Sequence, residues 1–446
     1  MNKPANGGVA KTQISRRMLF AYALPAAPLA ALGLPLYSLV PTYYTETLGL
    51  PIASVGWVLL LVRLVDAITD PLAGYAADRI NPRFGRRRLL FLLSLPIAAL
   101  SALMLYWPAD GAGVVWLAIW GMLTSLGFTL AVVPYSAWGA ELVADYHGRT
   151  RLTSVREGLT LVGTLIAIVL PFAIGFERQG FSGLALLGIT VVVSLLVFGG
   201  LTVWIVPEPA NLTREPLPLR EALSCLSRNR PFLRLIAAFF LNGLANGIPA
   251  TLFLNFVSAR LQLPDMRGPL LFLYFFSAIA GIPLAAWTAQ RLGKHRAWAM
   301  AMIFACAIFS AAPMLPPGAL VPFALICAST GLLLGFDLTL PPSIQADVID
   351  ADTAASGDQR SGFYFAAWGL ATKLSLATGV GTVFPLLGFF GFDPATAAQN
   401  SATALLALAV IYAWVPVALK LGAIALMWNF PLDETAQKKL QSRIHP

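Results

Sequence analysis

Three charged side chains lie within one apolar stretch of the sequence. Arg63, Asp66 and Asp70 are spaced so that they share one face of a helix. An ionised side chain at the centre of a membrane-spanning helix costs roughly 2.5–3.5 kcal/mol on insertion scales, so such residues are functional candidates. Two carboxylates one turn apart repel unless a positive charge lies between them, and a monovalent cation, a shared proton or Arg63 could supply it. We predict that Asp66 and Asp70 bind a monovalent cation; the alternative is an Arg–Asp pair that only holds helices together.

A second set of ionisable residues lies in the C-terminal part of the chain. Asp337 and Lys373 each stand in a long apolar stretch, and Lys373 has no carboxylate within its own stretch. An unpaired ion inside a bilayer is expensive, so we expect Lys373 to pair with a carboxylate on another helix. Asp66, Asp70 and Asp337 are the candidates. An ion pair between distant parts of the chain would let cation binding change how those parts pack on each other. The alternative is an ion pair that only holds the helices together.

The composition excludes a soluble protein. The 446 residues are 58% hydrophobic and only 11% charged, whereas soluble proteins carry about 25% charged residues. We therefore predict an integral helical membrane protein. The net charge of +9 comes from basic residues between the apolar stretches, so we expect no nucleic-acid partner. The sequence contains no nucleotide-binding or metalloprotease motif, and its three histidines lie outside the apolar stretches, so we expect neither an enzyme nor a cofactor.

Twelve apolar stretches are long enough to cross a bilayer. They lie near residues 18–42, 51–77, 89–107, 112–140, 157–176, 181–206, 233–258, 267–290, 297–315, 319–346, 362–390 and 402–428. We expect a tail (1–17), a six-helix half (18–206), a central loop (207–232), a second six-helix half (233–428) and a tail (429–446). Most of the 30 Lys and Arg residues fall in the tails and even-numbered loops. This bias predicts that both termini are cytoplasmic and that the chain is a multi-pass protein of the cell (inner) membrane.

A short glycine-containing turn occurs once in each half. Asp78-Arg79 and Arg83-Phe-Gly85-Arg86 follow the second apolar stretch, and Arg291-Leu-Gly293-Lys294 follow the eighth. A glycine permits a tight turn, and cations beside it favour the cytoplasmic side. Two parallel six-helix halves that rock around a central site form the major facilitator fold, which we predict here. The candidate gating or cytoplasmic-motif residues are Arg63, Asp78, Arg79, Gly85, Arg86, Asp347 and Asp350.

These motifs resemble those of the glycoside-pentoside-hexuronide:cation symporters, over essentially the whole chain. The resemblance rests on Asp66-Ala-Ile-Thr-Asp70-Pro71 and the turn that follows it, and on Asp347-Val-Ile-Asp350 with Lys373 farther on. It implies that Asp66 and Asp70 coordinate the coupling ion, which is Na⁺, Li⁺ or H⁺. It also implies that Thr129 helps to hold this ion and that Lys373 lies near it.

The sugar-binding part of the resemblance is incomplete. Sugar-transporting members of that family use a carboxylate in the first span and another in the fourth, and the corresponding positions here are Ala30 and Val132. Only a fifth-span arginine has a counterpart, Arg156. The residues themselves suggest other contacts: Asn242 and Asn246 share a helix face, Asp337 lies in an apolar stretch, and Tyr135 and Trp368 are candidate stacking residues. The predicted substrate-binding set is therefore Arg156, Asn242, Asn246, Asp337, Trp368 and Tyr135.

Two functions follow from these patterns. The first is a secondary active cation-coupled symporter that moves a sugar or glycoside by alternating access. The alternative keeps the cation mechanism but carries an amphiphile such as a lysophospholipid, which the small, apolar first span would suit. We expect the small-molecule substrate and the lipid bilayer to be the partners, and the carrier to be a monomer.

Overall fold

The computed structural model describes residues 15–79, 85–142, 146–173, 175, 181–208, 226–356 and 361–432. These residues form helices joined by short loops, and none of them lies in a β-strand. The side chains of Asp70, Asp78, Arg79 and Arg86 lie outside the part of the structure that is described.

The first part of the chain forms an N-terminal bundle. Its helices are α1 (Arg16–Ala23), α2 (Ala26–Gly33), α3 (Pro35–Ser38), α4 (Val40–Thr42), the π-helical turn η1 (Tyr43–Thr47), α5 (Ile52–Arg79), α6 (Arg86–Tyr106), α7 (Val114–Leu142), α8 (Tyr146–Ala173) and α9 (Gly183–Ile205). The predicted first span, 18–42, is thus divided among four short helices. Pro25, Pro35 and Pro41 stand at or beside the breaks, and each removes a backbone donor that a continuous helix would use.

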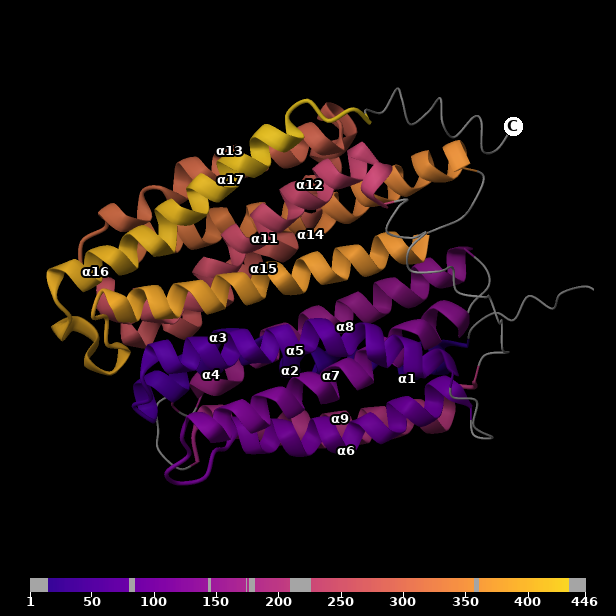
Figure 1. Ribbon diagram of the computed structural model, residues 1–446, viewed down its shortest axis with the longest axis horizontal. Helices are drawn as coiled ribbons and strands as arrows, with labels where there is room; N and C mark the ends of the chain where they lie inside the picture. Colours follow the sequence, from indigo (N-terminus) through magenta and orange to yellow (C-terminus); the bar gives the residue numbers. More distant parts are fainter. Residues whose placement is uncertain are drawn as a thin grey trace, which may run out of the picture.

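The rest of the described chain forms a C-terminal bundle. It contains α11 (Arg230–Asn255), η2 (Phe256–Arg260), η3 (Pro264–Met266), α12 (Arg267–Leu292), α13 (Lys294–Phe309), η4 (Ala312–Met314), α14 (Leu320–Ser356), α15 (Ser361–Phe389), η5 (Pro394–Gln399), α16 (Ala402–Ala409), η6 (Val410–Trp414) and α17 (Val415–Met427). Figure 1 shows this bundle above the N-terminal one, with the long axes of the helices running in the same general direction.

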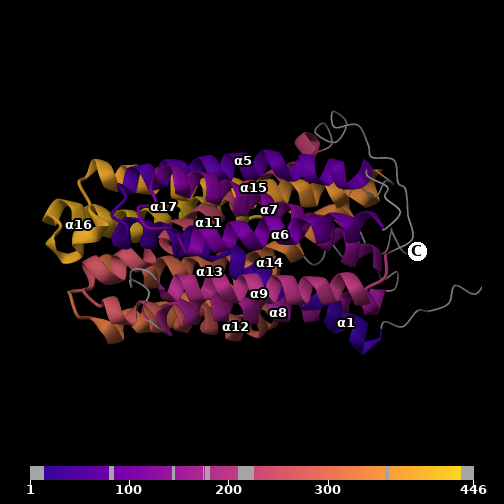
Figure 2. The ribbon, with the colours of Figure 1, turned by 90° about the horizontal axis from the view of Figure 1, so that it is seen from below.

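Eleven helical segments of the described chain are long and apolar enough to cross a membrane. The other long helix is α5, which carries Arg63 and Asp66. Its 28 residues extend over about 42 Å at 1.5 Å per residue, more than the roughly 30 Å hydrocarbon core of a bilayer. Figure 2 shows α5 running along the length of the bundle beside α15.

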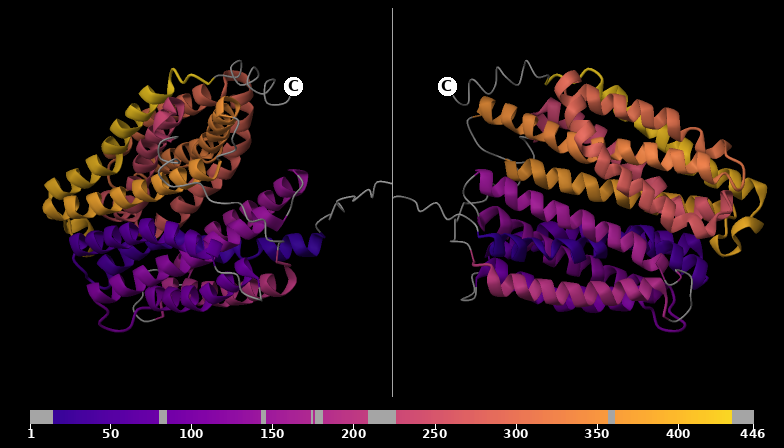
Figure 3. Two further views of the ribbon diagram at one scale, coloured as in Figure 1. Left: turned by 45° about the vertical axis from the view of Figure 1, so that its right-hand side comes forward. Right: turned by 180° about the vertical axis from the view of Figure 1, so that it is seen from behind.

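The two bundles touch mainly where α5 packs on α15 and where α8 packs on α12. Gly56 of α5 permits the first of these contacts, because a Cβ atom there would lie 2.6 Å from Cβ of Phe384 on α15. Such small residues let membrane helices approach closely. The ribbons of the two bundles lie close together at one end and diverge toward the other, as Figure 3 shows from two sides.

We call the end at which the ribbons diverge the basic end. It carries Arg16 at the start of α1, Arg291 at the end of α12 and Lys294 at the start of α13. The repeated glycine turns lie here. Gly85 precedes α6 with φ 92° and Gly293 precedes α13 with φ 83°, a backbone region that glycine reaches without steric cost.

Candidate functional site

Asp66 lies at the contact between the two bundles and is almost fully buried, with 1% of its surface exposed. One of its oxygens, Oδ2, is 3.1 Å from Nζ of Lys373 on α15 and 3.4 Å from Nη1 of Arg63 on α5. The other, Oδ1, accepts a hydrogen bond of 3.0 Å from the hydroxyl of Thr129 on α7. A carboxylate of the N-terminal bundle is therefore held by a cation of the C-terminal bundle.

This arrangement brings together three of the four residues predicted at the cation site. Asp66, Thr129 and Lys373 meet, and the fourth, Asp70, lies one turn farther along α5, where side chains are not described. Of the carboxylates considered as partners for Lys373, Asp66 makes the ion pair that the structure defines. Carboxylate and hydroxyl oxygens are the ligands that hard cations prefer.

Arg63 is incompletely satisfied beside this carboxylate. Its guanidinium carbon lies 4.7 Å from the centre of the Tyr37 ring, and its buried Nη2 atom has no hydrogen-bond partner among the described residues. Arg63 and Lys373 together place two cations around Asp66. The local charge is therefore positive unless a second carboxylate contributes, and Asp70 has the position in the sequence to do so.

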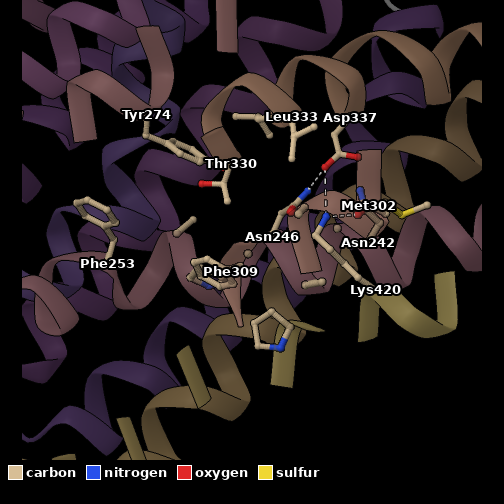
Figure 4. Close-up of a pocket in the computed structure, with 18 of the residues that line it drawn as sticks. Asn242, Asn246, Phe253, Tyr274, Met302, Phe309, Thr330, Leu333, Asp337 and Lys420 are labelled. Carbon is tan, nitrogen blue, oxygen red and sulfur yellow. Dashed lines mark hydrogen bonds and ion pairs between the residues drawn. The ribbon is translucent and has the colours of Figure 1, made fainter. Parts of the chain in front are cut away.

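A second buried ionic cluster lies wholly within the C-terminal bundle. Its centre is Asp337 of α14, whose Oδ1 accepts a 2.6 Å hydrogen bond from the Trp298 indole and whose Oδ2 accepts one of 2.9 Å from the Asn246 amide. Nζ of Lys420 on α17 lies 3.4 Å from Oδ2 of Asp337 and donates a hydrogen bond to Oδ1 of Asn242. Figure 4 shows the polar side chains of Asn242, Asn246, Asp337 and Lys420 directed toward one another.

This cluster borders a cavity of about 390 Å³. In Figure 4 the polar groups of Asn242, Asp337 and Lys420 gather at one end, while Phe253 and Tyr274 lie at the other. The cavity is therefore apolar along most of its wall and polar at one end, which is the usual composition of a small-molecule site.

The remaining predicted substrate residues lie apart from this cavity. Trp368 stacks on Phe239, which lines the cavity, with ring centres 3.7 Å apart. Tyr135 is buried in the N-terminal bundle and donates a 2.7 Å hydrogen bond to the carbonyl of Tyr22. Arg156 forms a 2.7 Å ion pair with its neighbour Glu157. The structure thus brings Asn242, Asn246 and Asp337 together, and it does not bring Arg156 or Tyr135 to them.

Asp347 and the Gly85 turn, both part of the predicted gating set, lie at the basic end. Asp347 of α14 binds Lys294 of α13, with Nζ 2.7 Å from each carboxylate oxygen. At Gly85, the carboxylate of Glu208 accepts hydrogen bonds from the backbone N–H groups of Arg87 and Arg88 at 2.9 and 3.0 Å. Glu208 thereby caps the first turn of α6, where a negative charge is favourable. Asp350 is half-buried in α14.

At the opposite end, an ion pair between Glu46 and Arg267 joins the two bundles. Nη1 of Arg267, the first residue of α12, lies 2.7 Å from Oε2 of Glu46 in η1, and these side chains are only 5% and 9% exposed. Asn255 donates a longer bond of 3.4 Å to Oε1 of Glu46. This pair was not predicted from the sequence. The available signal was that Arg267 is one of few basic residues in the odd-numbered loops.

Sequence reasoning also missed the role of Lys420 in the C-terminal cluster. The available signal was a lysine within the last apolar stretch, because a buried ammonium requires a partner. Its partners Asn242 and Asp337 are far away in sequence, so the pairing depends on how α11, α14 and α17 pack.

Comparisons with known proteins agree with this architecture. A family described as MFS/sugar transport protein matches residues 19–434. The isoprimeverose transporter of Lactiplantibacillus pentosus is 25% identical, covering 91% of this chain and 87% of its own. The sodium-dependent lysophosphatidylcholine symporter 1 of Gallus gallus is 22% identical, covering 94% and 87%. The crystal structure of a D-xylose-proton symporter superposes with a TM-score of 0.67 at 14% identity, covering 94% and 98%.

Proposed function

Because the chain belongs to the MFS/sugar transport protein family, and is therefore a multi-pass protein of the cell membrane, we propose that it moves a sugar or glycoside together with a monovalent cation. The observation that carries this proposal is the position of Asp66. This buried carboxylate is hydrogen-bonded to Thr129 of the N-terminal bundle and ion-paired with Lys373 of the C-terminal bundle. A cation that binds there acts on the contact between the bundles.

The cation enters as a competitor of Lys373. Oδ2 of Asp66 faces the ammonium at 3.1 Å, while Oδ1 and the Thr129 hydroxyl form a pair of oxygen ligands on the side of α7. A Na⁺ or Li⁺ ion shared by these oxygens and by Asp70 offsets one negative charge of the two carboxylates and weakens the attraction to Lys373. A proton on Asp66 would have the same effect, so the same residues serve either kind of coupling ion.

Replacement of Lys373 by the cation at Asp66 couples cation binding to cargo binding. Lys373 belongs to α15, and the neighbouring residue Thr372 lines the cavity, whose wall comes mostly from the C-terminal bundle. Release of Lys373 by the cation changes both the contact between the bundles and one wall of the cavity. Cation and cargo then raise each other's affinity by the same factor, as linkage requires, and the bundles rock between access to one side and access to the other.

Uptake by energised cells tests this proposal. We expect Asp66→Asn to abolish concentrative uptake of a radiolabelled glycoside and Thr129→Val to lower it, while both variants reach the membrane at the wild-type level. Asp110→Asn is the matched control, because Asp110 is an exposed carboxylate in the loop between α6 and α7. Normal accumulation by Asp66→Asn would refute the cation site, and omission of Na⁺ or Li⁺, or collapse of the proton gradient, identifies the ion.

One observation favours an amphiphilic cargo instead. The cavity wall opposite the polar cluster is aromatic, with Phe253, Tyr274 and Phe309 along it, and an acyl chain would bind such a wall. The similarity to a symporter named for lysophosphatidylcholine points the same way. The same cells incubated with labelled lysophosphatidylcholine distinguish the two cargoes. Each chain contains both the cation site and the cavity, so we propose that the monomer is the transporting unit.

A further inference from the structure

The N-terminal bundle lacks the carboxylates with which a sugar would be bound there. Ala30 and Val132 occupy the two positions that the family resemblance marks for sugar contacts. A sugar nevertheless needs several convergent polar groups, because each buried hydroxyl must be paired. The polar cluster of the C-terminal bundle, made of Asp337, Lys420 and two asparagines, borders the cavity and has no part in the cation mechanism described above.

We propose that Lys420, Asp337, Asn242 and Asn246 form the subsite that binds two neighbouring hydroxyl groups of a neutral cargo. This inference rests on the proposed symport of a sugar or glycoside and places recognition in the C-terminal bundle. Lys420 is its specificity-determining residue, with Asp337 holding the ammonium in position. The aromatic end of the cavity receives the ring face or the apolar substituent of the cargo.

The cluster contains both donors and an acceptor that make no hydrogen bond within the described chain. Within the described chain, Lys420 uses two of its three ammonium protons, on Asn242 and Asp337. The side-chain nitrogen of Asn242 and the side-chain oxygen of Asn246 make no hydrogen bond to the described residues, although both asparagines line the cavity. A hydroxyl group both donates and accepts, so a vicinal pair of hydroxyls satisfies these donors and this acceptor together.

The charge balance of the cluster favours a neutral cargo. Asp337 and Lys420 carry opposite charges 3.4 Å apart, and both side chains are 11% exposed. An anionic group that approached Lys420 would also face the carboxylate of Asp337, and a cationic group near Asp337 would face the ammonium of Lys420. Hydroxyl groups meet neither repulsion, and hydrogen bonds to charged groups are stronger than those to neutral ones.

The subsite and the cation site use different helices. The cluster comes from α11, α13, α14 and α17, whereas Asp66, Thr129 and Lys373 lie on α5, α7 and α15. Loss of the subsite should therefore weaken cargo binding without weakening binding of the cation alone. This separation makes the inference testable independently of the cation mechanism.

The experiment measures binding of radiolabelled phenyl β-glucoside to the purified full-length protein in lipid nanodiscs with saturating Na⁺, Li⁺ or acidic buffer. We expect Lys420→Met to lower the affinity for the glucoside at least tenfold and to leave cation affinity, measured without cargo, within twofold of wild type. The double variant Asp337→Asn/Lys420→Met keeps the cluster neutral, so a similar loss there excludes an unpaired buried charge as the cause. Arg296→Met, which removes an exposed positive charge from the same bundle, is expected to bind normally.

Four ligands distinguish the chemistry of the cargo: phenyl β-glucoside, its deoxy analogue lacking one hydroxyl of a neighbouring pair, phenyl β-glucuronide and lysophosphatidylcholine. We expect the neutral glucoside to bind most tightly, and the deoxy analogue to lose affinity in wild type but not in Lys420→Met. Tighter binding of the glucuronide or of lysophosphatidylcholine would overturn the inference. If wild type binds and accumulates the glucoside and Lys420→Met binds it equally well, the subsite is refuted but the proposed function stands. If wild type binds none of the four ligands with any cation, both the subsite and the proposed function are refuted.

Discussion

Replacement of Glu46 by glutamine should open the end of the carrier that the Glu46–Arg267 pair now closes. The two side chains are buried and 2.7 Å apart, and Arg267 remains charged when its partner is removed. Breaking a buried ion pair in this way costs about 3–5 kcal/mol. Arg267 keeps its 3.1 Å hydrogen bond to the carbonyl of Pro264, so we take the lower value, about 3 kcal/mol.

This cost falls only on the conformation in which the two bundles meet at that end, because both side chains reach water when the bundles separate there. A difference of about 3 kcal/mol changes an equilibrium constant by about a hundredfold. A closed state favoured by about 100:1 in wild type would then be populated about equally with the open one in Glu46→Gln.

Pulsed electron paramagnetic resonance measures this shift directly. Nitroxide labels at Asp110→Cys and Met314→Cys report the distance between the bundles at this end, because both sites are exposed and belong to different bundles. The native cysteines are first replaced by alanine. We expect a second, longer distance in Glu46→Gln and its loss in the charge-swapped Glu46→Arg/Arg267→Glu variant. Superimposable distance distributions for wild type and Glu46→Gln would refute the reasoning.

Three further predictions concern the contact between α5 and α15. Lys373→Met removes the competitor of the cation at Asp66, so we expect cation affinity to rise about tenfold while concentrative uptake is lost; weaker cation binding, measured by calorimetry, would contradict the competition. Thr129→Val deletes the hydroxyl that donates to Asp66, and we expect cation affinity to fall about tenfold. Thr288→Val should not change it, because this half-buried threonine of α12 donates to the carbonyl of Leu284 in its own helix. Gly56→Leu forces a side chain against Phe384, and we expect lower thermal stability and loss of uptake, with Gly158→Leu, which faces open space, as the control in a thermal-shift assay.

Sequence patterns could predict the membrane helices and the ion pair between Asp66 and Lys373, but not the ion pair between Asp337 and Lys420. The apolar stretches and their charges predicted a helical membrane protein and identified Asp66 and Lys373, because an ion in a bilayer needs a counter-ion wherever it lies. The spacing of Asn242 and Asn246 likewise predicted a shared helix face. The choice of Lys420 as the partner of Asp337 depends on how α14 and α17 pack on their common neighbours α11 and α13, which no local pattern encodes.

The location of the cavity was unpredictable for a related reason. Its wall is built from apolar residues on several helices, and in sequence these residues are indistinguishable from those that face lipid. Tyr135 illustrates the same limit: an aromatic residue in a span can stack on a cargo, or it can bind the backbone of a neighbouring helix as Tyr135 binds Tyr22.

The proline breaks between α1 and α4 have a mechanical consequence. The backbone hydrogen bonds of a continuous helix resist bending, and each proline removes one of these bonds. This segment, with three prolines at or beside its breaks, is therefore more compliant than a continuous helix, and its residues Leu34, Tyr37 and Ser38 form part of the cavity wall. Compliance in this part of the wall lets the cavity adjust its width to cargoes of different bulk, while α5, none of whose described residues lines the cavity, keeps its register against α15.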